Sequence, residues 1–217
     1  MNLGQLTPDL PYLLAGARLT LLLASLAFVA AIVIGIVVAL LRLSPIRPLS
    51  WLASFYVDLF RSTPLFVQLV WFFYALPILT GLSLDPVATG VMGLGLYTAS
   101  YFAEVFRTGI LSLPSGQREA ALAIGMTELQ AMRRVILPQA VRRVLPPSVS
   151  VAVTLVKDSS LASVVSVPEL LWQASSLAAT TFRPLEALTV AAMIYFVITY
   201  PLTLLGNAVH RRVVRAT

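Results

Sequence analysis

Long apolar runs without charged residues are the feature that most restricts how this chain can fold. Leu19–Leu41, for example, contains 23 residues and no charged side chain. A helix needs about 20 mostly apolar residues to cross the hydrocarbon core of a membrane. The runs are apolar on every face, whereas the strands of a membrane barrel alternate apolar and polar residues. The sequence therefore predicts an all-α membrane protein.

Five membrane-spanning helices are predicted, and we interpret residues 1–217 as a single transmembrane domain. The approximate limits of the spans are 19–41, 55–80, 86–107, 144–168 and 187–209. The fourth span is interrupted at its centre by Lys157 and Asp158. The longest polar segment, 108–143, is predicted to be a cytoplasmic loop.

The composition supports this interpretation and excludes several other classes of protein. Hydrophobic residues make up 59% of the chain and charged residues 11%, whereas soluble domains average about 25% charged residues. The net charge of +6 is read as membrane topology and not as affinity for nucleic acid, because basic residues collect in cytoplasmic loops. The chain has no Cys, which excludes disulfides and thiol catalysis.

The arginines predict the orientation of the spans. They gather between alternate spans and near the C-terminus, at positions 42, 47, 107, 118, 133, 134, 142, 143, 211, 212 and 215. By the positive-inside rule these segments are cytoplasmic. The N-terminus is therefore expected outside and the C-terminus in the cytoplasm, as an odd number of spans requires.

The polar loop is predicted to contain short helices separated by breakers. A helix is expected over Gln117–Ile124, with Gly125 as its C-cap. Thr127 and Gln130 have the spacing of a capping box that opens a second helix, and Pro138 is expected to mark the next break. Such a loop is either a docking element for a partner or a simple connector between two spans.

One pattern in this loop resembles a known signature. Glu119-Ala120-Ala121 is followed after three residues by Gly125, and after nine more by Val135-Ile-Leu137-Pro138. This spacing resembles the EAA signature of membrane subunits of bacterial ABC importers, with Val135 as the one departure. The segments 60–68, 103–110 and 155–161 look like the polar amino acid branch of that family.

The resemblance implies a fold, a set of partners and a place in the cell. The fold would be the five-helix core of type I importer permeases in the bacterial inner membrane. Two permease subunits, identical or homologous, would enclose the path, and an extracytoplasmic binding protein would deliver the amino acid. Two ATPase subunits would bind ATP and Mg and would dock on the loop residues Glu119, Ala120, Ala121, Gly125, Val135, Leu137 and Pro138. Besides membrane lipid, no other partner and no cofactor is expected for this chain.

Lys157 and Asp158 are the first candidates for the substrate path, together with the hydroxyls of Ser159 and Ser160. Charges at bilayer depth cost about 2.5–3.5 kcal/mol each on insertion scales and normally face the protein interior or water. One cation and one anion match the two charges of an amino acid. The alternative is a structural role, in which these charges neutralise each other or pair with a neighbouring helix.

Thr63, Pro64 and Gln68 are the second group of path candidates. Pro64 cannot donate a backbone hydrogen bond and kinks a helix, and Gln68 is a polar group at depth that needs a partner. The alternative is that Gln68 bonds to another helix.

Two acid–base pairs are predicted to be structural ion pairs near the cytoplasmic ends of spans. Asp58 and Arg61 are three residues apart, as are Glu104 and Arg107, and this spacing places each pair on one helix face. A role in gating is the alternative.

No catalytic pattern is found, so the chain is not expected to be an enzyme. The sole lysine lies within a span, which excludes a phosphate-binding loop of the Walker type, and a single His cannot form a usual metal site. An ion-gradient-driven secondary transporter and a non-transporting membrane scaffold are the alternative functions. The loop pattern distinguishes them, because only an ABC importer needs an ATPase partner.

Overall fold

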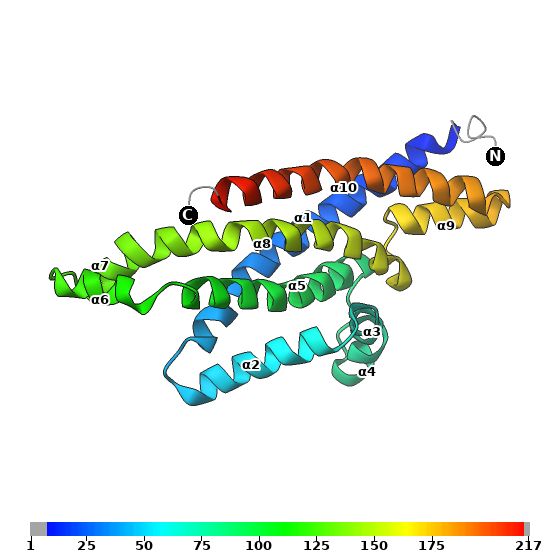
Figure 1. Ribbon diagram of the computed structural model, residues 1–217. Helices are drawn as coiled ribbons and strands as arrows, with labels where there is room; N and C mark the ends of the chain where they lie inside the picture. Colours follow the sequence, from blue (N-terminus) through cyan, green and yellow to red (C-terminus); the bar gives the residue numbers. More distant parts are fainter. Residues whose placement is uncertain (1–7, 215–217) are drawn as a thin grey trace.

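The computed structural model describes residues 8–214, and within this range it contains helices and no strand (Figure 1). The α-helical bounds are α1 (Leu10–Arg42), α2 (Arg47–Ser62), α3 (Leu65–Val70), α4 (Leu76–Thr80), α5 (Pro86–Leu111), α6 (Ser115–Ala123), α7 (Glu128–Ala131), α8 (Leu137–Asp158), α9 (Leu170–Thr181) and α10 (Pro184–Val214). The prediction of an all-α membrane fold is confirmed.

Helices α5, α8 and α10 lie side by side, and α1 crosses them (Figure 1). The most extensive packing joins α1 to α5, and it depends on small residues. A Cβ atom added at Gly35 would lie 2.7 Å from the Cβ of Phe102, closer than packed carbons approach. The start of α1 and the end of α10 lie at opposite ends of the molecule (Figure 1).

The described residues contain three helical segments that are long and apolar enough to cross a membrane, within 10–42, 128–165 and 184–211, and a fourth if a bent pair is one span. The remaining predicted span corresponds to α5, whose 26 residues extend about 39 Å at 1.5 Å per residue. Its Gly, Thr and Ser residues are largely buried, which explains why this helix is less apolar. A fifth span therefore stays a prediction.

The second span bends at Pro64, where a kink was predicted, and the bend divides it into two separate helical segments. The helical segments 47–62 and 65–80 meet at an angle of 105°. Pro64 has no N–H for the helix and restricts the residue before it to an extended conformation, and Thr63 has φ −107° and ψ 138°. A π-helical turn, Trp71–Ala75, follows α3.

Pro138 was predicted to interrupt the helix, but the helix continues through it. A π-helical turn, Met132–Ile136, connects α7 to α8 and absorbs the proline. At its end the N–H of Leu137 bonds to the carbonyl of Met132, five residues back. This wider spacing accommodates a ring that cannot donate to the ladder. The helical segment that contains the fourth span therefore starts at Glu128, inside the predicted loop.

The two charges expected at the centre of the fourth span lie instead at the end of a helix. Helix α8 stops at Asp158, and Ser159–Val165 forms a 3₁₀ segment. The hydroxyls of Ser159 and Ser160 donate to carbonyls three residues back, those of Val156 and Lys157. Such bonds compete with regular helix geometry, which is consistent with the change of helix type here.

A buried carboxylate fastens α9 to the long helices. Glu169 is fully buried, and its side chain accepts a hydrogen bond from the Trp172 N–H at the start of α9. It also accepts from the hydroxyls of Thr20 on α1 and Tyr195 on α10, at 3.3 and 2.5 Å. Burial raises the pKa of Glu169 above its usual range, although these hydrogen bonds partly lower it.

Candidate functional site

Gln68 closes the break in the second span. Its Nε2 donates to the carbonyl of Phe60 at 2.9 Å and to the hydroxyl of Thr63 at 2.6 Å. Both acceptors lie on the far side of Pro64, so the amide replaces bonds that the proline removes. Gln68 thus bonds across its own bent span, and not to another helix.

The break is brought next to the end of α8. Helix α3 packs against the 3₁₀ segment through an apolar cluster in which Leu65 and Leu69 meet Ala162 and Val165. Two groups of sequence-predicted path residues, far apart in the chain, therefore lie on adjacent elements. Ser159 is buried between them and Ser160 is half-buried.

Asp158 lines a small pocket between α5 and α8. The pocket has a volume of about 210 Å³ and is also lined by Tyr97, Tyr101 and Thr154. The two tyrosine hydroxyls are 2.9 Å apart. The Arg61 guanidinium lies over the ring of Tyr101, 5.2 Å from its centroid, within the range of a cation–π contact. An acid and two phenols thus line one pocket, and a cation contacts one of the phenols.

Lys157 does not line this pocket, although it is next to Asp158 in the chain. Neighbouring residues of a helix point about 100° apart, and Lys157 lines a separate groove between α8 and α10. That groove has a volume of about 550 Å³ and includes Thr203, Asn207 and His210. Sequence reasoning missed Tyr97 and Tyr101 as pocket residues, although their spacing of four residues places them on one face of a helix.

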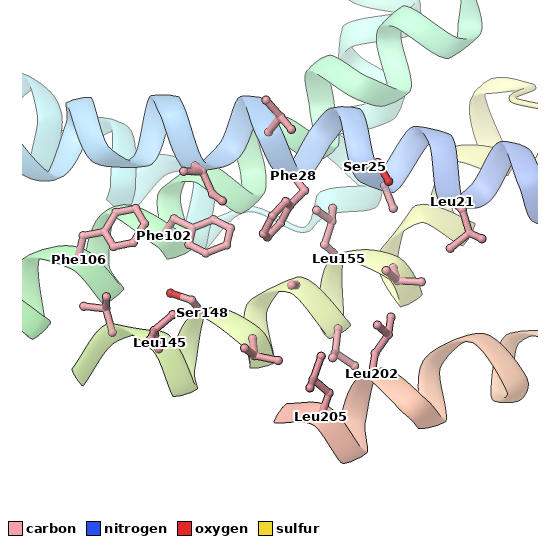
Figure 2. Close-up of a pocket in the computed structure, with 18 residues that line it drawn as sticks. Leu21, Ser25, Phe28, Phe102, Phe106, Leu145, Ser148, Leu155, Leu202 and Leu205 are labelled. Atoms are coloured by element: carbon pink, nitrogen blue, oxygen red, sulfur yellow. The ribbon is translucent and has the colours of Figure 1, made fainter. Parts of the chain in front are cut away.

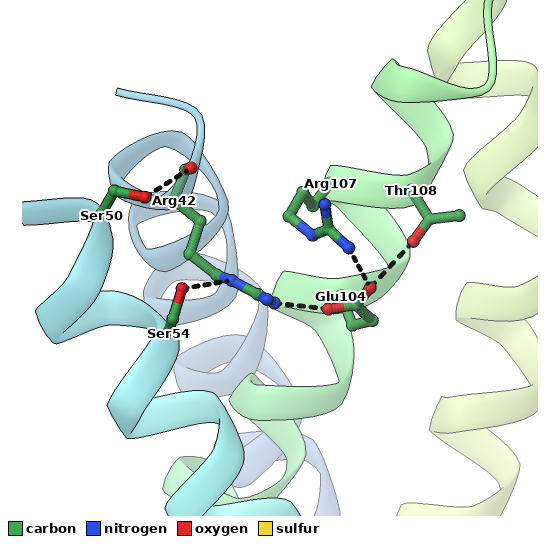
Figure 3. A network of polar contacts seen from close by, with 6 residues as sticks. All are labelled: Arg42, Ser50, Ser54, Glu104, Arg107 and Thr108. Carbon is green, nitrogen blue, oxygen red and sulfur yellow. Dashed lines mark hydrogen bonds and ion pairs between the residues drawn. The ribbon is translucent and has the colours of Figure 1, made fainter. Parts of the chain in front are cut away.

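A charged network joins three helices where α1 ends (Figure 3). Glu104 on α5 accepts from Arg107 at 2.7 Å, forms an ion pair with Arg42 of α1, and accepts from the hydroxyl of Thr108 at 3.1 Å. Arg42 also donates through Nε to Ser54 on α2. The geometry of the Glu104–Arg107 pair agrees with the sequence expectation, while the link to Arg42 was not foreseen.

The second expected ion pair is wrong. Among the residues that the structure describes, no ion pair joins Asp58 to Arg61. Three-residue spacing allows such contact but does not require it, and the Arg61 side chain is instead placed over Tyr101. Arg61 therefore contacts Tyr101, one of the residues that line the pocket of Asp158, and not its own helix partner.

The loop with the EAA pattern forms an elbow of two short helices at the same end of the molecule as the charged network (Figure 1). Gly125 has φ +83° and ends α6 in a Schellman motif, in which its N–H bonds to Leu122 and the next N–H bonds to Ala121. The predicted C-cap and the capping box of Thr127 and Gln130 are confirmed.

The elbow leaves part of the pattern exposed. Glu119, Ala120 and Gly125 are exposed, whereas Ala121 is only 4% exposed and packs inward. Val135 is half-buried, and Leu137 and Pro138 are exposed. An ion pair between Arg118 and Glu128 ties α6 to α7. The elbow therefore presents one small-residue face outward on a braced turn.

Comparison with known proteins matches residues 31–215 to the family of binding-protein-dependent transport system inner membrane components. The chain belongs to this family. The match covers most of the chain and confirms the resemblance found in the EAA pattern, that of an ABC importer permease. No group of three potential metal-ligating residues occurs in the range 8–214.

Two curated relatives show how closely the sequence of the permease matches known proteins. It is 36% identical to the arginine transport system permease protein ArtQ of Bacillus subtilis over 94% of both chains. It is 39% identical to the L-cystine transport system permease protein TcyB of the same organism, over 94% of this chain and 88% of the relative.

Among solved structures, the permease superposes on a chain of an amino acid ABC transporter crystallised with histidines, with a TM-score of 0.92. The identity is 33%, and the match covers 98% of this chain and 99% of the other. The inward-facing MetNI methionine transporter, at 24% identity and a TM-score of 0.77, shares the fold. These likenesses give the chain the type I importer permease fold.

Proposed function

We propose that this permease moves a polar amino acid into the bacterial cytoplasm as part of an ABC importer in the cytoplasmic membrane. The observation that carries the proposal is the family match over 31–215. Relatives named for the transport of arginine, cystine and glutamate or aspartate support the substrate class. A second permease, two ATPase subunits that bind ATP and Mg, and an extracytoplasmic binding protein complete the transporter.

The pocket of Asp158 is the proposed contact with the amino acid. A carboxylate pairs with an ammonium group, and a guanidinium binds a carboxylate through two parallel hydrogen bonds. Asp158 and Arg61, placed around the Tyr97–Tyr101 hydroxyl pair, match the two charges of the substrate better than Lys157 and Asp158 do. Thr63, Pro64 and Gln68 shape the adjoining wall, and Ser159 and Ser160 hold the end of α8 beside it.

Uptake by the reconstituted complex tests this assignment. Asp158→Asn is expected to reduce ATP-driven amino acid uptake at least tenfold, because the neutral amide no longer pairs with the ammonium group. Lys157→Gln is the matched control, since it removes the neighbouring charge from a different groove. Equal loss in both variants, or normal uptake by Asp158→Asn, would contradict the assignment of Asp158.

The elbow of α6 and α7 is the proposed contact with the ATPase. Its exposed residues Glu119, Ala120 and Gly125 form the docking face, while Ala121, Val135, Leu137 and Pro138 connect that face to α8. Since α8 continues from the elbow to the pocket, movement of a docked ATPase would be transmitted along this helix to the substrate path.

Two variants of the elbow test the coupling. Glu119→Lys and Gly125→Trp are expected to abolish ATP-driven uptake and to reduce recovery of the ATPase with the permease. Gly81→Trp is the control, because Gly81 also has a positive φ and open surroundings but lies at the end of α4, far from the elbow (Figure 1). Full uptake by both elbow variants would refute the coupling role.

The alternative functions are separated by the same reconstitution. A secondary transporter would move solute through this chain under an ion gradient without an ATPase, and a scaffold would move none. Uptake that requires both ATP and the partner ATPase distinguishes the importer from these two classes.

A further inference from the structure

A large groove lies away from the pocket of Asp158, between α1, α8 and α10 (Figure 2). Its volume is about 720 Å³. The floor is an aromatic row in which Phe102 makes an edge contact with Phe28 and stacks on Phe106, with centroid distances of 5.7 and 5.6 Å. Ser25 and Ser148 are the only polar residues in the lining. The volume lies in the range of small-molecule sites, but the walls offer almost no polar recognition.

The groove opens sideways along the spans. Its rim is formed by exposed leucines, Leu21 of α1, Leu145 of α8 and Leu205 of α10. All three lie within segments long and apolar enough to cross a membrane, so the opening faces the hydrocarbon of the bilayer. A flexible apolar chain is the chemistry that fits such walls.

An arginine that is not itself a lining residue lies close to the groove in the sequence of α8. Arg142 lies three residues before Leu145 and seven before Val149, so it is on the same face of α8 as these two lining residues. It is exposed, and no ion pair engages it in the described part of the chain. The next residue, Arg143, turns away and donates to Ser112. Arg142 thus stands where the apolar run of α8 begins.

We propose that this groove binds one anionic phospholipid, with an acyl chain against the Phe28–Phe102–Phe106 row and the phosphate on Arg142. The apolar lining favours the acyl chain of the lipid. The unpaired guanidinium of Arg142 favours a negatively charged headgroup. Basic sites between spans on the cytoplasmic side are suited to such lipids. The bound acyl chain would fill the groove between α1, α8 and α10.

Fluorescence quenching tests the proposal on the full-length chain in mixed micelles. The chain has no native Cys, so Leu145→Cys gives a single site for a fluorescent label. Phosphatidylglycerol with a spin label on its acyl chain is expected to quench this label at about fivefold lower concentration than spin-labelled phosphatidylcholine. This preference corresponds to about 1 kcal/mol for one arginine near the membrane surface.

Variants of Arg142, the proposed headgroup contact, and of the groove wall, the proposed acyl-chain contact, complete the test. Arg142→Gln should remove the preference and Arg142→Lys should keep it, while Arg133→Gln, at an exposed position outside the groove, should change nothing. Ala152→Phe, which fills the groove wall, should weaken quenching by both lipids.

Three results would overturn the proposal. These are equal quenching by the two lipids in labelled Leu145→Cys without a second substitution, unchanged preference when Arg142→Gln is added, or a disulfide between two unlabelled Leu145→Cys chains in the membrane. The last result would mean that a second copy of the chain covers the groove.

Discussion

Gln68 and Glu169 are two buried polar residues that connect parts of the chain through hydrogen bonds. Gln68 bridges Phe60 and Thr63 across a proline break, and Glu169 joins α1, α9 and α10. Removing one partner of a buried hydrogen bond leaves the other unsatisfied, which costs about 1–3 kcal/mol. Both residues therefore have consequences for stability that can be measured separately from transport.

Gln68→Leu is expected to destabilise the permease by about 1–3 kcal/mol, because the carbonyl of Phe60 and the hydroxyl of Thr63 lose their donor. The measurement is the thermal unfolding midpoint of the purified protein in detergent. Gln117→Leu, which alters an exposed glutamine on α6, is the control and should change the midpoint little. An unchanged midpoint in Gln68→Leu would show that the amide does not hold the break.

The raised pKa of Glu169 predicts that the free energy of unfolding depends on pH. Because burial raises its pKa in the folded protein, the folded state holds the proton to higher pH than the unfolded chain, whose glutamate has a pKa of about 4.3. The contribution of the protonated group is thus complete below about pH 4.3 and is lost as the pH rises through the raised folded value.

Unfolding midpoints measured from pH 4 to pH 9 check this dependence. The Glu169→Gln variant should lose this part of the pH dependence, because its amide does not titrate. The variant Glu186→Gln, at a half-buried glutamate in the first turn of α10, should retain it. A parallel pH dependence in the parent and in Glu169→Gln would contradict the prediction.

At the scale of elements, the fit of α1 against α5 depends on glycine. Gly35→Ala is expected to destabilise the permease by about 1–3 kcal/mol, the usual cost of overpacking, since the new Cβ meets Phe102 at 2.7 Å and the carbonyl of Ala99 at 3.2 Å. Gly116→Ala in α6 meets nothing within 4 Å and should stabilise by about 0.4–1 kcal/mol. Chemical or thermal unfolding of the two variants would compare these effects, and the same sign in both would refute the packing argument.

The elements also show where local signals in the sequence were sufficient. The C-cap at Gly125 and the capping box at Thr127 were predicted correctly. Each of these motifs depends only on residues a few positions apart in the sequence. The kink at Pro64 was predicted but the size of the bend was not, and the persistence of helix through Pro138 was not predicted. Both sites contain a proline, and the local sequence does not say whether a sharp bend or a π-helical turn will absorb it.

At the scale of the whole molecule, the arginine-rich ends of α1, α5 and α10 and the start of α8 gather with the elbow at one end (Figure 1). The positive-inside rule predicts that this end is cytoplasmic. A Cys introduced at Gly116 should therefore resist a membrane-impermeant thiol reagent in intact cells and react after lysis. A Cys at Leu82, in the exposed loop after α4, should react in intact cells. The opposite pattern would invert the orientation.

The sequence by itself determined the helical class, the membrane setting, the family and the caps of the elbow. These depend on composition and on spacing within about 20 residues, which a linear chain records directly. Only the tertiary structure decided that Asp158 shares a pocket with Tyr97 and Tyr101 while Lys157 lines another groove, that Arg61 meets Tyr101 and not Asp58, and that Arg42 joins Glu104. Such contacts depend on how distant helices rotate and cross, and packing of the whole chain sets those angles.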